Sequence, residues 1–376
     1  MVNLFVLILS LRGRLNYLNM SRYGDYNEKS YRKQFNKDFD FEVFNKLLVT
    51  TFCSNNKGII FDPSHISKSG KHTPGVGYFW SGCANSTKWG LEIGGLAIVD
   101  FDNHTAFHYI AEQTILKDKK EESLLGYYST IIKKRAEALL ALSNTIYVDA
   151  FFSKQSFVQP IVEAGFHLVS RLQSNAYLRY RYIGEQSQKQ GRPKTFDGKI
   201  NPKNITHSTF SIVLQNENER IYEGLAHSRA LNRLIKVAIV QGLKEGQVSS
   251  AHIYFSTDTS TTAIDIYTNY KLRFQIEYLY RDSKQHLGLT QCQSRNTKAL
   301  HFHFNASLST LNLAKIAHWL IIPKENRGAF SIADIKTQYI NENLLNQLIL
   351  IYGKDPIVEI NTPAIRNLYN LGRIAA

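Results

Sequence analysis

The hydrophobic positions along the chain alternate between short β-branched runs and longer stretches with helical spacing. Two short runs, 58–61 and 145–148, stand directly before an aspartate and predict buried strands. Residues 123–142 place apolar side chains three and four positions apart, which predicts an amphipathic helix. Two hairpin strands are predicted at 75–80 and 91–100. A helix is predicted at 157–164 and a further strand at 166–172. This order of elements is typical of an α/β sandwich.

A second pattern begins near Arg171, where the chain becomes basic and is interrupted by Gly and Pro. Residues 171–203 contain eight Lys or Arg and only two acidic residues. Strand-like runs follow at 208–214, 220–225, 234–240 and 251–256. We interpret residues 173–256 as a mostly β insertion that presents a cationic surface, and a loop cluster without a ligand is the alternative.

The stretch from Tyr270 to Lys284 carries no Gly or Pro and follows good N-cap residues at 258–260, which predicts a helix beginning shortly after Ser260. At about 100° per residue, one stripe of this helix carries a tyrosine, a carboxylate and three cations. These residues are Tyr270, Arg273, Glu277, Arg281 and Lys284. A solvated helix face held by side-chain pairs four apart is the alternative.

The two ends of the chain are predicted to be helical. Residues 12–50 interleave cations with aromatic residues along two short helices, a composition that suits a DNA-gripping module and equally a small helical domain with a solvated basic face. Val2–Leu11 predicts a short buried helix, and 299–322 predicts a long apolar one. The tail after Pro323 has a moderately polar, helical pattern.

Composition and charge narrow the class of protein. The 376 residues are 43% hydrophobic and 20% charged, as in an ordered globular protein, yet the net charge is +14. Such an excess of cations indicates a polyanionic partner, nucleic acid first and an anionic membrane surface second. No stretch reaches the roughly 18 apolar residues of a membrane span. The Gly70-Lys71 pair lacks the spacing of a nucleotide-binding loop, so no nucleotide cofactor is expected.

The three cysteines, Cys53, Cys83 and Cys292, are scattered and fit neither a disulfide framework nor a metal site. They favour a reduced, cytoplasmic compartment.

Three acidic residues on separate predicted elements supply candidate chemistry. Asp62 and Asp149 follow predicted strands, and Glu277 lies on the predicted helix. Metal-assisted phosphodiester cleavage needs hard oxygen ligands for two divalent ions, and Mg²⁺ needs only one or two carboxylates for each ion. We therefore predict Asp62, Asp149 and Glu277 as catalytic metal ligands for two Mg²⁺, with Mn²⁺ as a substitute.

The spacing Tyr-x2-Arg-x3-Glu-x6-Lys, followed by Gln285-His286-Leu287-Gly288-Leu289, resembles the signature of bacterial insertion-sequence transposases of the DDE class. The resemblance extends along most of the chain and implies an RNase H-like mixed sheet flanked by helices and interrupted by the β insertion. Asp62, Asp149 and Glu277 match the family's three acids in order. The insertion resembles that of the family at Gly191-Arg192-Pro193-Lys194.

The resemblance also implies how DNA is bound. Tyr270, Arg273 and Lys284 match family residues that contact the phosphate and displaced base near the cut end, and Arg281 shares their predicted face. Arg171, Arg192 and Lys194 are the basic residues of the insertion that we expect to contact DNA. The insertion also offers an aromatic residue to stack on the displaced base, with Tyr177, Tyr180 and Tyr182 as the candidates.

The implied activity is cleavage at the terminal inverted repeats of an insertion sequence and joining to target DNA. A homodimer on double-stranded DNA, within the bacterial nucleoid, is the expected active form. A catalytically idle or domesticated descendant that still binds DNA is the alternative. One departure bears on it, because Pro63 and Ser64 follow Asp62 where relatives often carry Asp and Thr; Asp100 or Asp102 would be the substitute acid.

These inferences divide the chain into five segments. They are a helical DNA-binding region at 1–55, the first part of the RNase H-like core at 56–172, the β insertion at 173–256, the second part of the core at 257–322 and a helical tail at 323–376.

Overall fold

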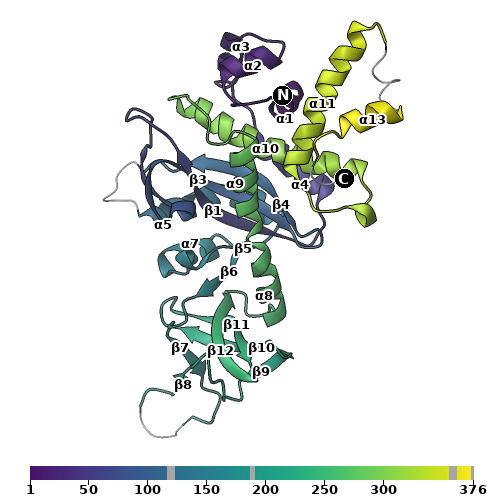
Figure 1. Ribbon diagram of the computed structural model, residues 1–376. Coiled ribbons are helices and arrows are strands. Elements are labelled where there is room, and N and C mark those ends of the chain that lie inside the picture. Colours follow the sequence, from purple (N-terminus) through teal and green to yellow (C-terminus); the bar gives the residue numbers. More distant parts are fainter. Residues whose placement is uncertain (117–122, 187–190, 355–361, 374–376) are drawn as a thin grey trace.

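The computed structural model describes residues 1–116, 123–186, 191–354 and 362–373. Within these residues, twelve strands form one mixed sheet, with helices on both faces of its core part (Figure 1). The predicted α/β class, with an RNase H-like sheet, a β-rich insertion and a small helical N-terminal region, is confirmed.

The core of the sheet is built around β1 (Lys57–Ser67). On one side β1 pairs antiparallel with β3 (Ser86–Asp100), which pairs in turn with β4 (Thr105–Gln113). On the other side β1 pairs in parallel with β5 (Thr145–Tyr147), and β5 with β6 (His167–Leu172). Three antiparallel strands followed by two parallel ones give the order β4-β3-β1-β5-β6.

Two adjacent glycines of β3 show how closely helices approach both faces of this sheet. A Cβ on Gly94 would meet Ile131 of α5 (Leu124–Lys133) at 3.0 Å. A Cβ on Gly95 would lie 2.0 Å from the Oη of Tyr280, on α9 (Gln275–His286). Since successive strand residues point to opposite faces, α5 and α9 cover opposite sides of the sheet.

Four further described helices complete the cover of the core. The short α6 and α7 follow α5, at Ala136–Leu140 and Gln155–Glu163, and α4 (Phe41–Phe52) packs against β4. The longest helix, α10 (Thr297–Ile321), contacts both β4 and α4. None of the described helices combines the length and the apolar character that a bilayer crossing requires.

Buried amide side chains of α10 bond to the backbone of β4. Asn305 accepts from the Ala111 N–H at 2.8 Å and donates to its carbonyl at 3.0 Å, and Asn312 bonds both backbone groups of His108 at 2.8 Å. These amides satisfy buried backbone groups as a neighbouring strand would. The His108 ring also contacts the Asn305 Oδ1 at 3.0 Å, and burial lowers the pKa of His108 to about 3.

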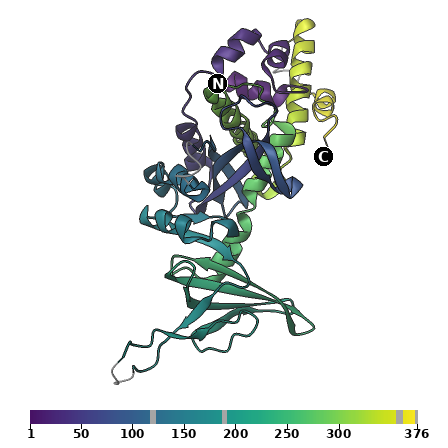
Figure 2. The ribbon, with the colours of Figure 1, turned by 90° about the vertical axis from the view of Figure 1, so that its left-hand side faces the viewer.

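The insertion forms the lower part of the molecule in Figures 1 and 2. Its six strands are β7 (Leu178–Arg181), β8 (Phe196–Lys199), β9 (Phe210–Gln215), β10 (Glu219–Ser228), β11 (Arg233–Lys244) and β12 (Gln247–Ser256). The last of them, β12, pairs antiparallel with β6, so the insertion continues the core sheet. The chain then enters α8 (Ala263–Leu272), which precedes α9.

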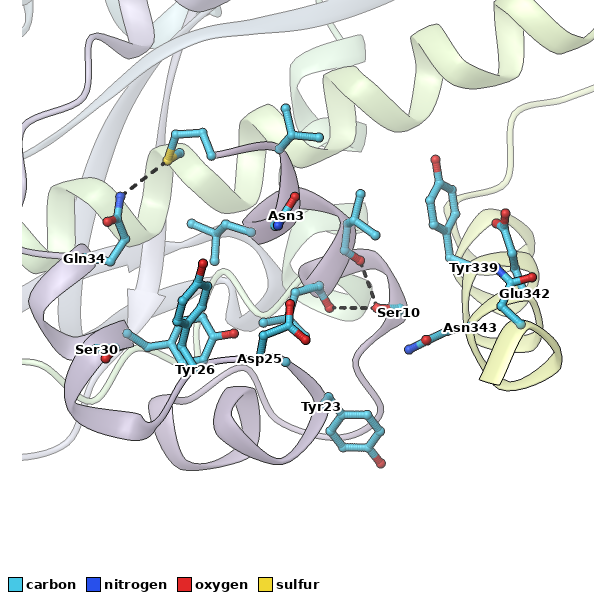
Figure 3. A pocket seen from close by; sticks show the side chains of 18 of the residues that line it. Asn3, Ser10, Tyr23, Asp25, Tyr26, Ser30, Gln34, Tyr339, Glu342 and Asn343 are labelled. Carbon is cyan, nitrogen blue, oxygen red and sulfur yellow. Dashed lines mark hydrogen bonds between the residues drawn. The ribbon is translucent and has the colours of Figure 1, made fainter. Parts of the chain in front are cut away.

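The N-terminal helix α1 (Val2–Ser10) packs against α11 (Ile332–Ile351), and α13 (Pro363–Tyr369) also packs on α11 (Figure 1). The helices α2 (Tyr17–Tyr23) and α3 (Glu28–Gln34) pack on each other. The predicted short buried helix at the start of the chain is α1. A cavity of about 1060 Å³ lies between α1, α3 and α11 (Figure 3). None of the three predicted catalytic acids lines it.

The structure corrects several predicted elements. The predicted helix 123–142 is broken into α5 and α6 at Lys134 and Arg135. The stretch 270–284 is not one helix, because α8 ends at Leu272 and α9 begins at Gln275. The sequence analysis missed α4, β4, β7 and β8.

Strand β1 also continues beyond the predicted run 58–61 and through Pro63. Its parallel neighbour β5 pairs only with Ile59 and Ile60. At Pro63, β1 therefore has β3 as its one neighbour, and the missing N–H is tolerated as it is on an edge strand.

Candidate active site

Asp62 lies in the middle of β1, opposite Gly95 of β3. The Tyr280 hydroxyl donates a hydrogen bond of 2.6 Å to the Asp62 carbonyl oxygen. Only a glycine at position 95 leaves room for that hydroxyl, as the 2.0 Å approach to an added Cβ shows. The backbone that carries Asp62 is therefore fixed from both the strand and the helix side.

The environment of Asp62 disfavours its negative charge. Burial raises the pKa of Asp62 to about 8, Arg273 acts against this rise, and the nearby Asp149 and Glu277 add to it. The three predicted acids are thus close enough to interact electrostatically. An additional positive charge among them would stabilise the ionised form of Asp62.

Asp149 follows β5 and begins a short 3₁₀ helix at Ala150–Phe152. Its side chain accepts a hydrogen bond of 2.8 Å from the Phe151 N–H, and its carbonyl accepts one of 2.8 Å from the Ser170 hydroxyl of β6. β5 is only three residues long, so these two bonds hold Asp149 just past the end of the strand. It is partly exposed.

The turn between α8 and α9 sets the position of Arg273. Here the N–H groups of Arg273 and Glu277 bond three residues back, to Tyr270 and Phe274, which tightens the backbone and separates the helices. The Arg273 Nη2 donates to the Glu277 Oε1 at 2.8 Å. The Nε and Nη1 of Arg273 are buried and have no hydrogen-bond partner among the described residues.

Lys284 and Tyr270 extend the site in opposite directions along α9 and α8. The Lys284 Nζ donates to the Ser64 Oγ at 2.8 Å, on the strand that carries Asp62. The Tyr270 ring packs 5.1 Å from that of Tyr254, and it interacts electrostatically with Arg171 of β6. Arg171, Tyr270, Arg273 and Lys284 are therefore brought together around the acids.

Other predicted contact residues lie elsewhere. The Arg281 guanidinium is largely exposed, pairs with Asp282 at 3.0 Å and lies over the Tyr278 ring, although Arg281 lies on α9 within one turn of Glu277 and Lys284. Arg192 and Lys194 are exposed near β8, at the end of the insertion away from the core sheet (Figure 1). The Lys194 ammonium pairs with Asp197 and lies over the Tyr182 ring.

Among the candidate stacking aromatics of the insertion, Tyr180 is buried and stacks on His207. Tyr177 is exposed and flanked by the cations of Lys199 and Arg229 at 5.4 and 5.7 Å from its ring. Exposure between two cations suits Tyr177 better than Tyr180 for contact with a nucleotide.

Sequence analysis missed two groups next to the acids, Glu92 and Tyr280. Glu92 is buried on β3, where it accepts hydrogen bonds from Tyr128 (2.5 Å) and Thr114 (2.9 Å), and burial raises its pKa. Its charge also acts on Asp62. A lone acid inside the apolar run Leu91 to Val99 was a signal that could have found Glu92.

The substitute acids Asp100 and Asp102 lie at the other end of β3. Asp100 is fully buried and accepts bonds from the N–H and hydroxyl of Ser54 and from Asn103, an arrangement that lowers its pKa and organises the turn after β3. Five strand residues separate it from Gly95, about 17 Å. It therefore stands apart from the acidic group.

The residues present fit a divalent metal ion in chemistry. All three acids offer hard carboxylate oxygens, and burial raises the pKa of Asp62 to about 8 even though the Arg273 charge acts against that rise. In this conformation the described residues include no group of three or more His, Cys, Asp or Glu side chains close enough to hold a metal ion. Glu277 is instead paired with Arg273.

An RNase H-like sheet with acids at two core strands and on a facing helix is an architecture found in enzymes that cleave nucleic acids and transfer strands. Residues 129–313 match the family model described as the transposase DDE domain. These residues, just under half of the chain, are therefore similar to the catalytic domain of DDE transposases, a family whose members act on DNA and generally use divalent metal ions. The matched range includes Asp149 and Glu277 and begins after Asp62. A search of the curated proteins found no match.

Proposed function

We propose that the protein binds the terminal inverted repeats of an insertion sequence, cuts the DNA there and joins the freed end to target DNA. Asp62, Asp149 and Glu277 are the catalytic carboxylates and would hold two Mg²⁺ ions, which Mn²⁺ can replace. The active form is a homodimer that holds two element ends, acting on nucleoid DNA in the bacterial cytoplasm.

The observation that carries this proposal is that Asp62, whose ionised form is disfavoured, lies beside Arg273, whose guanidinium has hydrogen-bond donors without partners among the described residues. Asp62 has a pKa of about 8 because it is buried next to other acids, and Arg273 beside it has two buried N–H groups without partners. A metal-bound phosphodiester supplies both missing charges, positive for Asp62 and negative for Arg273. In a purely structural ion-pair network, the carboxylate would be ionised and the guanidinium donors would all have partners.

The reaction proceeds by two displacements at phosphorus. Water attacks the phosphodiester at the element's end, which releases a 3′ hydroxyl and a 5′ phosphate. That hydroxyl then attacks a target phosphodiester and displaces a target 3′ hydroxyl, so one such bond forms for each that breaks. Bound divalent ions would activate the attacking oxygen and stabilise the leaving oxygen.

The chain's own side chains position the substrate for these steps. Arg273 can donate its free Nε and Nη1 hydrogens, which point from different edges of the planar guanidinium, to separate acceptors that include a phosphate oxygen. Lys284 places an ammonium beside Ser64, two residues past Asp62 on β1. Tyr270 and Arg171 lie on the side of the insertion and extend the contact surface in that direction.

The test is cleavage of a labelled duplex that carries the element's own terminal repeat, with Mg²⁺ or Mn²⁺. Wild-type protein should cut at the element's end, whereas Glu277→Gln and Asp149→Asn should bind the duplex and leave it uncut. Asp102→Asn is the matched control, since Asp102 is an exposed acid that bonds only to Asn56 in the turn after β3. The control should cut like wild type.

Cutting followed by covalent joining to a second DNA molecule would establish transposition over simple nuclease action. Binding of the repeat without cutting under either metal would favour the catalytically idle alternative.

A further inference from the structure

The ribbon formed by β2 (Gly77–Ser81) and the first residues of β3 extends past the end of the core sheet. β1 pairs with β3 only from Gly90 onward, whereas β2 pairs with residues 86–90. Residues 77–89 are thus a two-stranded hairpin with the short turn Gly82–Ala84 at its tip. The sequence analysis treated this region only as a hairpin and assigned it no role.

One face of the hairpin is aromatic and exposed. Tyr78 and Trp80 are two residues apart on β2, and Trp89 lies directly opposite Tyr78 on β3. Their exposed fractions are 72%, 58% and 39%, and the rings of Tyr78 and Trp89 meet edge to face at 5.2 Å. Trp89 is anchored by a hydrogen bond of 3.0 Å from its Nε1 to the Gly70 carbonyl. The three rings therefore form a fixed platform in solvent.

The charge around this platform is positive. From Pro63 to Leu91 the chain has no Asp or Glu and three lysines. Lys68 donates to the carbonyls of Cys292 and Ser294, Lys71 is exposed next to Gly70, and Lys88 is exposed on the hairpin face opposite to that of Trp89. Aromatic faces flanked by cations are the arrangement with which proteins bind the bases and phosphates of unpaired nucleic acid.

The hairpin also begins next to the acidic group. His65, three residues beyond Asp62 on β1, contacts the Trp89 carbonyl at 3.3 Å through its Nε2. Three strand residues span about 10 Å, roughly three stacked bases. The platform and the candidate active site are thus joined through β1 and β3.

We propose that Tyr78, Trp80 and Trp89 stack on unpaired bases of the DNA strand next to the scissile phosphate. The proposal rests on the proposed function, since it concerns the same DNA. Paired bases inside a duplex hide their faces, so the partner is a frayed, forked or already cut end. The chemistry is sequence-tolerant, because every base offers a flat face.

The experiment measures metal-free binding of a forked duplex, a blunt duplex of the same length and a single-stranded oligothymidylate. Wild type should prefer forked to blunt DNA. The double variant Tyr78→Ala/Trp80→Ala should bind forked DNA about tenfold or more weakly, because each stacked base contributes on the order of 1–3 kcal/mol. Its affinity for blunt duplex should be unchanged. Trp80→Ala should also weaken binding of forked DNA. Trp80→Tyr, which keeps an aromatic face, should bind forked DNA more tightly than Trp80→Ala does.

Tryptophan fluorescence supplies a direct readout. The chain has three tryptophans. The third, Trp319 of α10, packs against Phe107 of β4. Oligothymidylate should therefore quench emission from Trp80 and Trp89, and Trp80→Ala should remove part of that quenching. Tyr352→Ala is the matched control, because Tyr352 is an equally exposed aromatic just past α11.

Equal binding of forked DNA by wild type and the double variant, or no quenching by oligothymidylate, would overturn the proposal. A change in oligomeric state of the double variant without a change in DNA binding would also overturn it, in favour of a protein contact. Because binding is measured without metal, this test stands apart from cleavage. A wild type that discriminates forked DNA yet never cuts would refute the proposed catalysis and support the platform.

Discussion

Arg273 bonds Glu277 with one nitrogen, at 2.8 Å, while its other two guanidinium nitrogens are buried without partners among the described residues. The pair joins the end of α8 to the first turn of α9. A buried hydrogen-bond donor without a partner costs free energy, so an anionic ligand that accepts from Arg273 would bind favourably. Several predictions about the site depend on this relationship.

Replacing Arg273 should affect catalysis more than its charge alone suggests. Arg273→Lys keeps the charge and loses the planar pair of free donors, so cleavage at the element's end should fall about 100-fold, by analogy with loss of one transition-state donor. Arg281→Lys is the matched control on the adjacent helix α9, because the Arg281 guanidinium is largely exposed, pairs with Asp282 and lies over the Tyr278 ring. Single-turnover cleavage rates measure both. Equal rates for both variants would contradict the role of the free nitrogens.

Metal binding should release a proton near neutral pH. Asp62, with a pKa of about 8, is protonated at pH 7 in the metal-free fold and must ionise to bind a cation. Affinity for Mg²⁺ or Mn²⁺ should therefore rise about tenfold per pH unit until about pH 8. Calorimetric titration in two buffers of different ionisation enthalpy measures the proton released. Asp62→Asn should abolish the release.

The same shift has a consequence for stability without metal. A carboxyl whose pKa is raised on folding contributes stability that is present below the unfolded pKa and is lost as pH rises through the folded value. Asp62→Asn should therefore raise the unfolding temperature of the metal-free protein at about pH 8 and change it little near pH 4. A lower unfolding temperature at both pH values would show that Asp62 has a structural role instead.

Gly95 and Tyr280 should behave as a coupled pair. Gly95→Ala places a methyl group 2.0 Å from the Tyr280 hydroxyl and should cost about 1–3 kcal/mol of unfolding free energy. Tyr280→Phe loses the hydrogen bond to Asp62 and should cost about 1 kcal/mol. The double variant should cost less than the sum, because the hydroxyl is the closest atom. Denaturant unfolding of all four proteins measures the coupling, and strict additivity would refute it.

His108 should make the fold sensitive to acid. Its pKa is lowered from 6.5 to about 3 by burial, so the unfolded chain takes up a proton that the folded chain resists. Stability should therefore fall by about 2 to 3 kcal/mol between about pH 6.5 and pH 4.5 on account of this residue. His108→Gln keeps a donor for Asn305 and should flatten that slope, whereas His72→Gln, at an exposed position, should leave it unchanged. Urea unfolding across this pH range measures both slopes.

The sequence predicted those elements whose hydrophobic period was unbroken. The runs before Asp62 and Asp149 became β1 and β5, and the apolar spacing after Ala299 became α10. The strand β4 was missed because its buried edge is completed by Asn305 and Asn312 of α10, a partnership across almost 200 residues that no local pattern records.

The site was harder to predict than the sheet. A uniform 100° rotation per residue placed Tyr270 and Arg273 on one helix with Glu277, but the turn at Arg273 and Phe274 separates α8 from α9. Strand β1 continues beyond the predicted run 58–61 and through Pro63, because the neighbouring β5 is too short to need the N–H that proline lacks. Both differences come from what surrounds the segment.

The pairing of β12 with β6 couples the position of the insertion to that of Asp149 and Arg273. Four residue pairs join these strands, from Ile253 with Leu172 to Ser256 with Val169, and Ser170 between them holds the carbonyl of Asp149. β12 then leads within a few residues into α8, whose end carries Arg273. A tilt of the insertion must either break this ladder or move Asp149 and Arg273 with it. We therefore expect DNA bound by the outer strands of the insertion to displace Asp149 and Arg273 together.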